Sequence, residues 1–200
     1  GKILDAVSVL RDMETGAEPP QLGRRVIVYG GGNTAMDVAR TTKRLGADDT
    51  MIVYRRSRNE MPAHDFEARE AEEEGVMIHW LRTIKYIDET TFTVEKMEID
   101  EAGRPQPTGV VETIEADTLI LALGQDVDTS FLENVAGVEL AGDGVVSVND
   151  QMMTGRDGLF AGGDMVPSER TVTVAVGHGK KAARHIDAWL RDTLFESAEK

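Results

Sequence analysis

Short apolar runs alternate with longer stretches of helical periodicity along the first part of the chain. The apolar runs are 26–29, 51–54 and 76–81, and each predicts a strand. The stretches between them, 34–45 and 66–74, have helical spacing, and a glycine follows each. Strands that are joined by helices pair in parallel, so this alternation predicts an α/β fold with a parallel sheet.

The segment that precedes this alternation has a different pattern. Residues 3–13 place four apolar side chains at helical spacing, whereas residues 14–23 contain two glycines and two prolines. We therefore expect a helix that is followed by a linker.

After residue 81 the pattern changes to strands that are joined by turns. Residues 84–87, 91–99 and 110–115 are strand-like, and they predict an antiparallel meander appended to the sheet. Residues 118–123 then form a nearly continuous apolar run that ends at Gly124, which is typical of a buried central strand.

The last third of the chain contains weaker signals for strands and one strong signal for a helix. Residues 144–148 and 158–161 predict two short strands, and residues 172–194 predict a long terminal helix. No internal repeat and no low-complexity tract interrupts the sequence.

Charge and composition narrow the functional classes. The 200 residues contain 22 Lys and Arg against 36 Asp and Glu, a net charge of −14, which argues against nucleic acid or an anionic membrane surface as the main partner. No cysteine is present, so these residues supply no disulfide and no cysteine-ligated iron–sulfur cluster. No apolar run has membrane-spanning length and no signal peptide is evident, so we expect a cytoplasmic protein.

A glycine pattern lies directly between a predicted strand and a predicted helix. The sequence 30–35, Gly-Gly-Gly-Asn-Thr-Ala, fits Gly-x-Gly-x-x-Ala, the fingerprint of a dinucleotide-binding βαβ unit. In that unit Gly30 permits the tight turn, Gly32 lets the pyrophosphate approach the backbone, and Ala35 keeps the helix close to the strand. The N–H groups of Asn33 and Thr34 are then expected to face the phosphates.

Cofactor choice is predicted from the end of the second strand of the unit. An acidic residue there would favour NAD, because it binds the ribose hydroxyls and repels a 2′-phosphate. This chain has Arg55 and Arg56 instead, a basic spot in an acidic protein, and guanidinium groups suit a phosphate in charge and geometry. We therefore predict NADP(H). Arg58 is either a third contact or a solvated surface residue.

The segment 54–63, Tyr-Arg-Arg-Ser-Arg-Asn-Glu-Met-Pro-Ala, after the glycine motif closely resembles the glutamate synthase small-subunit family. Three further segments are similar to parts of flavoproteins with two dinucleotide-binding domains. They are 118–125, like the strand that closes the NADPH domain, 158–164, like the second FAD motif, and 171–183, like the helix that follows it.

The resemblance implies a domain order and a set of cofactor contacts. Residues 1–22 would be a connecting helix and linker, 23–126 a Rossmann-like NADPH-binding domain, and 127–200 the C-terminal portion of a split FAD-binding domain whose first half is expected before residue 1. The contacts implied for the cofactors are Gly124 and Gln125 beside the closing strand, Gly163 and Asp164 for the ribityl chain of FAD, and Thr173 and Val174 for the flavin ring.

The implied activity is hydride transfer from NADPH to FAD in the intact flavoprotein, with electron transfer onward to a large subunit or an iron–sulfur partner. Such transfer depends on positioning, so no catalytic acid–base residue is expected, and the four histidines are interpreted as structural or exposed. The alternatives are a ferredoxin–NADP oxidoreductase-type subunit and an NADP(H)-binding module without catalysis. No metal site is predicted. Because the resemblance makes the C-terminal tail half of a domain, we also expect it to expose apolar side chains and either to associate with a second copy of the chain or to be partly disordered.

Overall fold

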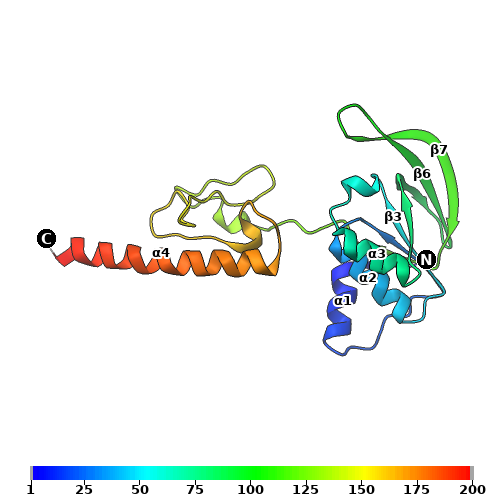
Figure 1. Cartoon of the computed structure of the whole chain (residues 1–200), viewed down its shortest axis with the longest axis horizontal. Coiled ribbons are helices and arrows are strands. Elements are labelled where there is room, and N and C mark those ends of the chain that lie inside the picture. The colour runs from blue at the N-terminus through cyan, green and yellow to red at the C-terminus, as the bar shows by residue number, and fades with distance from the viewer. Residues whose placement is uncertain (1, 199–200) are drawn as a thin grey trace. The chain divides into compact units, whose positions relative to one another are not determined.

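The computed structural model describes the backbone of residues 2–198 and the side chains as far as residue 192 (Figure 1). The chain divides into two compact units, Gly1–Gly124 and Gln125–Lys200.

The first unit is built on a five-stranded sheet in which every pair of neighbouring strands is parallel. The strands, in their order across the sheet, are β1 (Lys2–Asp5), β8 (Thr118–Leu121), β2 (Arg25–Tyr29), β3 (Asp49–Tyr54) and β4 (Met77–Trp80). β8 lies between β1 and β2 and buries Leu119 and Ile120. The prediction of a parallel sheet with a buried strand at 118–123 is confirmed.

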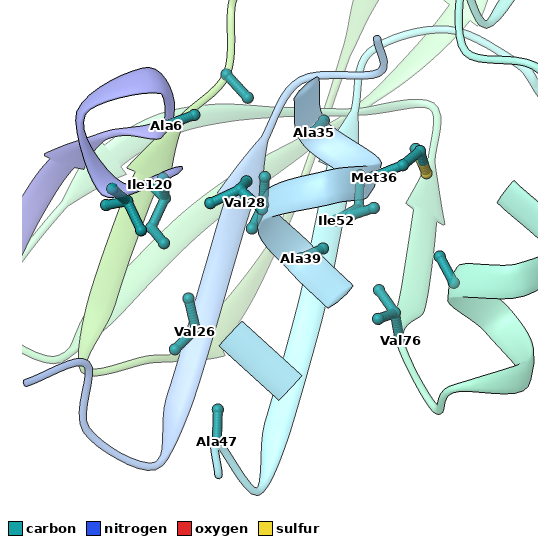
Figure 2. Close-up of a cluster of buried hydrophobic side chains, with 14 of the residues drawn as sticks. Ala6, Val26, Val28, Ala35, Met36, Ala39, Ala47, Ile52, Val76 and Ile120 are labelled. Carbon is teal, nitrogen blue, oxygen red and sulfur yellow. The ribbon is translucent and has the colours of Figure 1, made fainter. Parts of the chain in front are cut away.

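Three helices cover one face of this sheet: α1 (Ala6–Glu14), α2 (Asn33–Arg44) and α3 (Asp65–Glu73). Figure 2 shows α2 lying across the sheet, with Ala35, Met36 and Ala39 directed toward Val28 and Ile52. These side chains are fully buried. Burial of this apolar surface fixes α2, and with it the glycine turn at its start, against the strands.

The opposite face of the sheet is covered by an antiparallel meander of β5 (Arg82–Ile87), β6 (Thr91–Ile99) and β7 (Pro105–Glu115). Phe92 and Val94 of the meander pack against Ile27 and Val53 of the sheet. Neighbouring residues of a strand point to opposite faces of the sheet. Val28 and Ile52 therefore pack against the helices, while Ile27 and Val53 pack against the meander. The predicted meander is therefore confirmed.

The start of the chain differs from the prediction of one helix over residues 3–13. Residues 2–5 form β1, which pairs with β8, and α1 begins only at Ala6 because the Asp5 carboxylate accepts the Ser8 N–H at 2.9 Å. Residues 1–22, expected to be a connecting helix and linker, thus give the first unit an edge strand and a helix, and Ala6 and Val9 join its core.

The second unit contains one long helix, α4 (Val172–Ala198), and two short 3₁₀ turns, η2 (Ser130–Leu132) and η3 (Gly163–Met165). Its small core consists of Val146, Met152 and Val166 with partly buried neighbours. The prediction of strands at 144–148 and 158–161 is wrong, because Val146 and Phe160 form only isolated bridges, with Leu140 and Met153. A single bridge provides no ladder of paired neighbours, so these apolar runs remain irregular.

Candidate functional site

A cavity of about 700 Å³ opens where β2, β3 and β8 reach their carboxyl ends. Ligands of open α/β sheets bind at this edge, outside the carboxyl ends of the strands. The residues that line it are Tyr29, Gly30, Gly31, Gly32, Thr34, Tyr54, Arg55, Arg56, Glu60, Pro62, Ala122, Leu123 and Gly124. The sequence-predicted residues Gly30, Gly32, Thr34, Arg55, Arg56 and Gly124 are thus brought together.

The three glycines of the turn face different surroundings. A Cβ atom on Gly30 would collide with the backbone carbonyl of Ala122, and one on Gly31 would collide with the ring of Tyr54, whereas one on Gly32 would meet no atom within 4 Å. Gly30 and Gly31 are therefore required by the protein's own packing. Gly32 leaves room at the cavity, which is the space that a pyrophosphate needs.

The N-terminus of α2 faces the cavity without a side-chain cap. Gly32 is the N-cap residue and offers no side chain to the first N–H groups. In residues 2–198, the backbone N–H groups of Asn33 and Thr34 have no hydrogen-bond acceptor. Uncapped N–H groups and the positive end of the helix dipole together favour an anion.

The Asn33 side chain and Ala35 have structural roles. Asn33 Oδ1 accepts the backbone N–H of His64 at 3.3 Å, and Gly31 O accepts the N–H of Ala63 at 3.1 Å. The segment from Pro62 to His64 is therefore tied to the glycine turn, and Pro62 lines the cavity. Ala35 is fully buried in the helical core. In the sequence, residues 54–63 indicated only the family resemblance, and the position of Pro62 at the cavity was not predicted.

Arg55 and Arg56 follow β3 directly and bring positive charge to the cavity wall. Neither guanidinium lies within salt-bridge distance of a carboxylate in the part of the chain whose side chains are described. Burial raises the pKa of the adjacent Tyr54 phenol, and the positive charge of Arg56 partly offsets this rise. The two arginines thus keep their charge available for an anion.

Arg58 is oriented differently. Its guanidinium forms two hydrogen bonds with the Glu72 carboxylate, at 3.2 and 3.0 Å, and lies 5.9 Å from the centre of the Trp80 ring. Arg58 is not among the residues that line the cavity. The side chain is exposed and is held by Glu72 of α3, and a third phosphate contact by Arg58 stays a prediction.

The residues that the resemblance assigns to FAD lie in the second unit. Gly163 and Asp164 form the turn η3, and Asp164 is exposed. Val174 N–H is hydrogen-bonded to the Thr171 hydroxyl at 3.3 Å, while Thr173 is exposed at the start of α4. Gln125, predicted beside Gly124, belongs to this unit, where its carbonyl accepts a hydrogen bond from Arg170 at 2.9 Å.

His178 also holds this turn, which the sequence did not indicate. Its Nδ1 accepts the Gly163 N–H at 3.1 Å, and it lies close enough to Gly162 that a Cβ atom there would be 2.9 Å from the histidine Cβ.

Among the described residues no cluster of three metal-ligating side chains occurs, and none of their helices has the length and apolar character needed to cross a membrane.

Comparison with characterised proteins places this geometry in a family. The chain is 39% identical over 96% of its length to the NADP(+)-dependent formate dehydrogenase subunit beta of Moorella thermoacetica, of which it covers 28%. It is 34% identical over 96% of its length to the NADPH-Fe(3+) oxidoreductase subunit beta of Geobacter sulfurreducens, covering 33% of that protein. The chain thus spans about a third of the length of these relatives.

The resemblance to the glutamate synthase small subunit is confirmed. The small chain of Azospirillum brasilense glutamate synthase is 37% identical over 84% of this chain, which covers 38% of that protein. The fold is shared with the thioredoxin reductase of T. acidophilum, with a TM-score of 0.75 at 21% identity over 96% of this chain and 58% of that one.

The cofactors predicted from the sequence, NADP(H) and FAD, are those that family membership implies. Residues 2–179 match the family described as pyridine nucleotide-disulphide oxidoreductase. The match includes the glycine turn, both arginines, the meander and the turn at Gly163. The chain therefore belongs to the pyridine nucleotide-disulphide oxidoreductase family.

Proposed function

We propose that this chain is the NADP(H)-binding part of a flavin-dependent oxidoreductase that passes a hydride from NADPH to FAD and electrons onward to a partner subunit. The observation that carries the proposal is the pair Arg55 and Arg56, which lines the cavity at the end of β3 without carboxylate partners among the described side chains. An arginine pair at this position favours a 2′-phosphate over a free ribose hydroxyl.

Different parts of the cavity wall suit different parts of the dinucleotide. The open space at Gly32 and the N–H groups of Asn33 and Thr34 suit the pyrophosphate. Arg55 and Arg56 suit the phosphorylated ribose on the β3 side, and Leu123 and Gly124 extend the cavity on the β8 side. The resulting role of the protein is to bind and orient NADPH.

The reaction requires little acid–base chemistry from these residues. A bound nicotinamide would supply the hydride and a flavin would accept it, so the chain's own residues contribute orientation and electrostatic complementarity. The 200 residues contain no cysteine, which excludes them as the source of a redox-active disulfide. This agrees with relatives that are named for formate, Fe(3+) and glutamate rather than for a disulfide substrate.

Those relatives are named as subunits or chains of three different enzymes, a formate dehydrogenase, an Fe(3+) oxidoreductase and a glutamate synthase. We propose that the electron acceptor of this protein is selected by a partner subunit or an iron–sulfur centre outside these residues. A ferredoxin–NADP oxidoreductase-type role is the alternative within the same chemistry. The net charge of −14 disfavours nucleic acid as the partner.

A second candidate function is NADP(H) binding without turnover by the 200 residues alone. It is favoured by the location of the NADP(H) cavity entirely within the first unit, whereas the residues predicted for FAD lie in the second. Absorbance near 450 nm after addition of FAD and removal of free flavin distinguishes the two. Retained flavin that is bleached by NADPH without oxygen supports hydride transfer. NADPH binding without retained flavin supports the binding module, and absence of both contradicts the proposal.

A further inference from the structure

Glu60 is an acidic residue among those that line the cavity, together with the two arginines. A negative charge there opposes a phosphate ligand, and a salt bridge to Arg55 or Arg56 would neutralise the group that the phosphate needs. No such salt bridge forms within the described residues. The position of the Glu60 side chain therefore needs an explanation.

Glu60 instead closes the turn that directly follows the two arginines. Its Oε2 accepts the Ser57 hydroxyl at 2.8 Å and the Ser57 backbone N–H at 3.3 Å, and the second of these bonds belongs to a capping box around the 3₁₀ turn η1 (Arg58–Glu60). Both bonds keep the carboxylate turned toward the backbone of Ser57.

The backbone of Glu60 is fixed from the other side. Tyr54, the last residue of β3, donates its hydroxyl to the Glu60 carbonyl at 3.0 Å. Glu60 is therefore bonded to both Tyr54 and Ser57, and Arg55 and Arg56 lie between these two residues in the sequence. One glutamate thus ties both ends of the short segment on which the arginines are mounted.

We infer that Glu60 is a positioning residue for specificity, which fixes Arg55 and Arg56 for a 2′-phosphate and keeps its own carboxylate from neutralising them. The inference rests on the proposed function, because it assigns a role to Glu60 only if the arginines bind that phosphate. Rigid placement matters because guanidinium–phosphate contacts are directional and lose strength when the side chains must be ordered on binding.

The test compares two probes that differ only in the 2′-phosphate, adenosine 2′,5′-bisphosphate and AMP, titrated calorimetrically into the folded chain. Glu60→Ala should lower the affinity for the bisphosphate about tenfold and leave that for AMP within about twofold, since only the former uses the arginines. Glu60→Gln should keep the preference, because its amide oxygen can still accept both Ser57 bonds.

The matched control is Glu72→Ala. It removes an equal charge from a neighbouring position and frees Arg58, but leaves Ser57 and Glu60 untouched, so the preference should stay within about twofold of the parent value. If Glu60→Ala does not fold, Ser57→Ala, which removes the shorter of the two bonds, should lower bisphosphate affinity about fivefold.

The outcomes separate this inference from the proposed function. A parent chain that binds the two probes equally contradicts the 2′-phosphate site itself. A parent chain that prefers the bisphosphate, together with a folded Glu60→Ala variant that keeps the full preference, overturns only the role of Glu60. The role of Glu60 is also overturned if Glu60→Gln loses as much of the preference for the bisphosphate as Glu60→Ala does. The bonds to Ser57 would then not be the cause of the preference.

Discussion

Tyr54 lies directly over Gly31, so that a Cβ atom at position 31 would overlap the aromatic ring. The same ring makes an edge contact with Trp80, with centroids 6.3 Å apart, and its hydroxyl is bonded to the Glu60 carbonyl. Gly31→Ala should therefore displace Tyr54 and destabilise the chain by about 1–3 kcal/mol. Urea denaturation measures this change, and unaltered stability would show that the ring moves freely.

Side chains at Gly30 and Gly32 should have opposite effects on stability and on ligand binding. Gly32→Val should abolish dinucleotide binding while the fold survives, because the side chain would enter the open space at the cavity and its Cβ atom would meet no protein atom within 4 Å. Gly30→Ala should instead lower stability, because its Cβ atom would collide with the Ala122 carbonyl. Circular dichroism and calorimetry on both variants check the pair. Retained NADPH affinity in folded Gly32→Val would reject the pyrophosphate site.

These glycines show how far the sequence could predict the site. The spacing of Gly30, Gly32 and Ala35 indicated the turn and its ligand, because that pattern reflects local backbone geometry. Position 31 is the first x of the pattern Gly-x-Gly-x-x-Ala, which allows any residue there. Its restriction comes from Tyr54, which reaches the turn from the adjacent strand, and such a contact depends on side-chain placement that periodicity does not encode.

The same limit explains the elements that were predicted wrongly. Residues 2–5 have apolar positions that also fit a helix, and they become a strand because β8 offers a free edge beside which they can pair. Residues 144–148 and 158–161 have strand-like composition, but no neighbouring strand in the described part of their unit extends their bridges into a ladder. Strand formation depends on a partner that the local sequence does not specify.

An ion network between α2 and α3 gives a prediction about acid stability. Glu74 Oε1 accepts hydrogen bonds from Arg40, at 2.9 and 2.6 Å, and from Arg44 at 2.6 Å. These bonds lower the pKa of Glu74 from 4.5 to about 2, and the bond from Arg40 has the largest effect. Because the folded-state pKa is depressed, the stabilisation is fully present above pH 4.5 and is lost as the pH falls toward 2.

The Glu74→Gln variant tests this window. Its stability deficit relative to the parent chain should be constant from pH 7 to about pH 5 and should shrink between pH 4.5 and 2, where the parent glutamate becomes protonated. Denaturant midpoints measured across that range provide the comparison. A deficit that is independent of pH down to 2 would show that the charge of Glu74 is not the source of the stabilisation.

The exposed apolar side chains of α4 predict self-association of the chain. Val172, Val176, Ile186 and Leu190 are 82%, 51%, 36% and 47% exposed, and their spacing places them along one side of the helix. Trp189 of the same helix donates its indole N–H to Asp157 and packs against Gly158.

Light scattering coupled to size-exclusion chromatography should therefore show an oligomer that grows with concentration. The double variant Val176→Glu and Ile186→Glu should shift it toward the monomer, because each carboxylate would have to be desolvated in an apolar contact. A parent chain that is monomeric at every concentration would contradict the prediction.

The central claim, that the cavity is built for NADP(H), is tested most directly by calorimetric titration of the chain with NADPH and NADH. Charge-assisted contacts contribute about 1.5–3 kcal/mol each, so NADPH should bind at least about tenfold more tightly. The double variant Arg55→Ala and Arg56→Ala should erase that preference with NADH affinity nearly unchanged, and the control Arg58→Ala, whose guanidinium is held by Glu72, should retain most of it. Equal affinity of the parent chain for NADPH and NADH would contradict the claim.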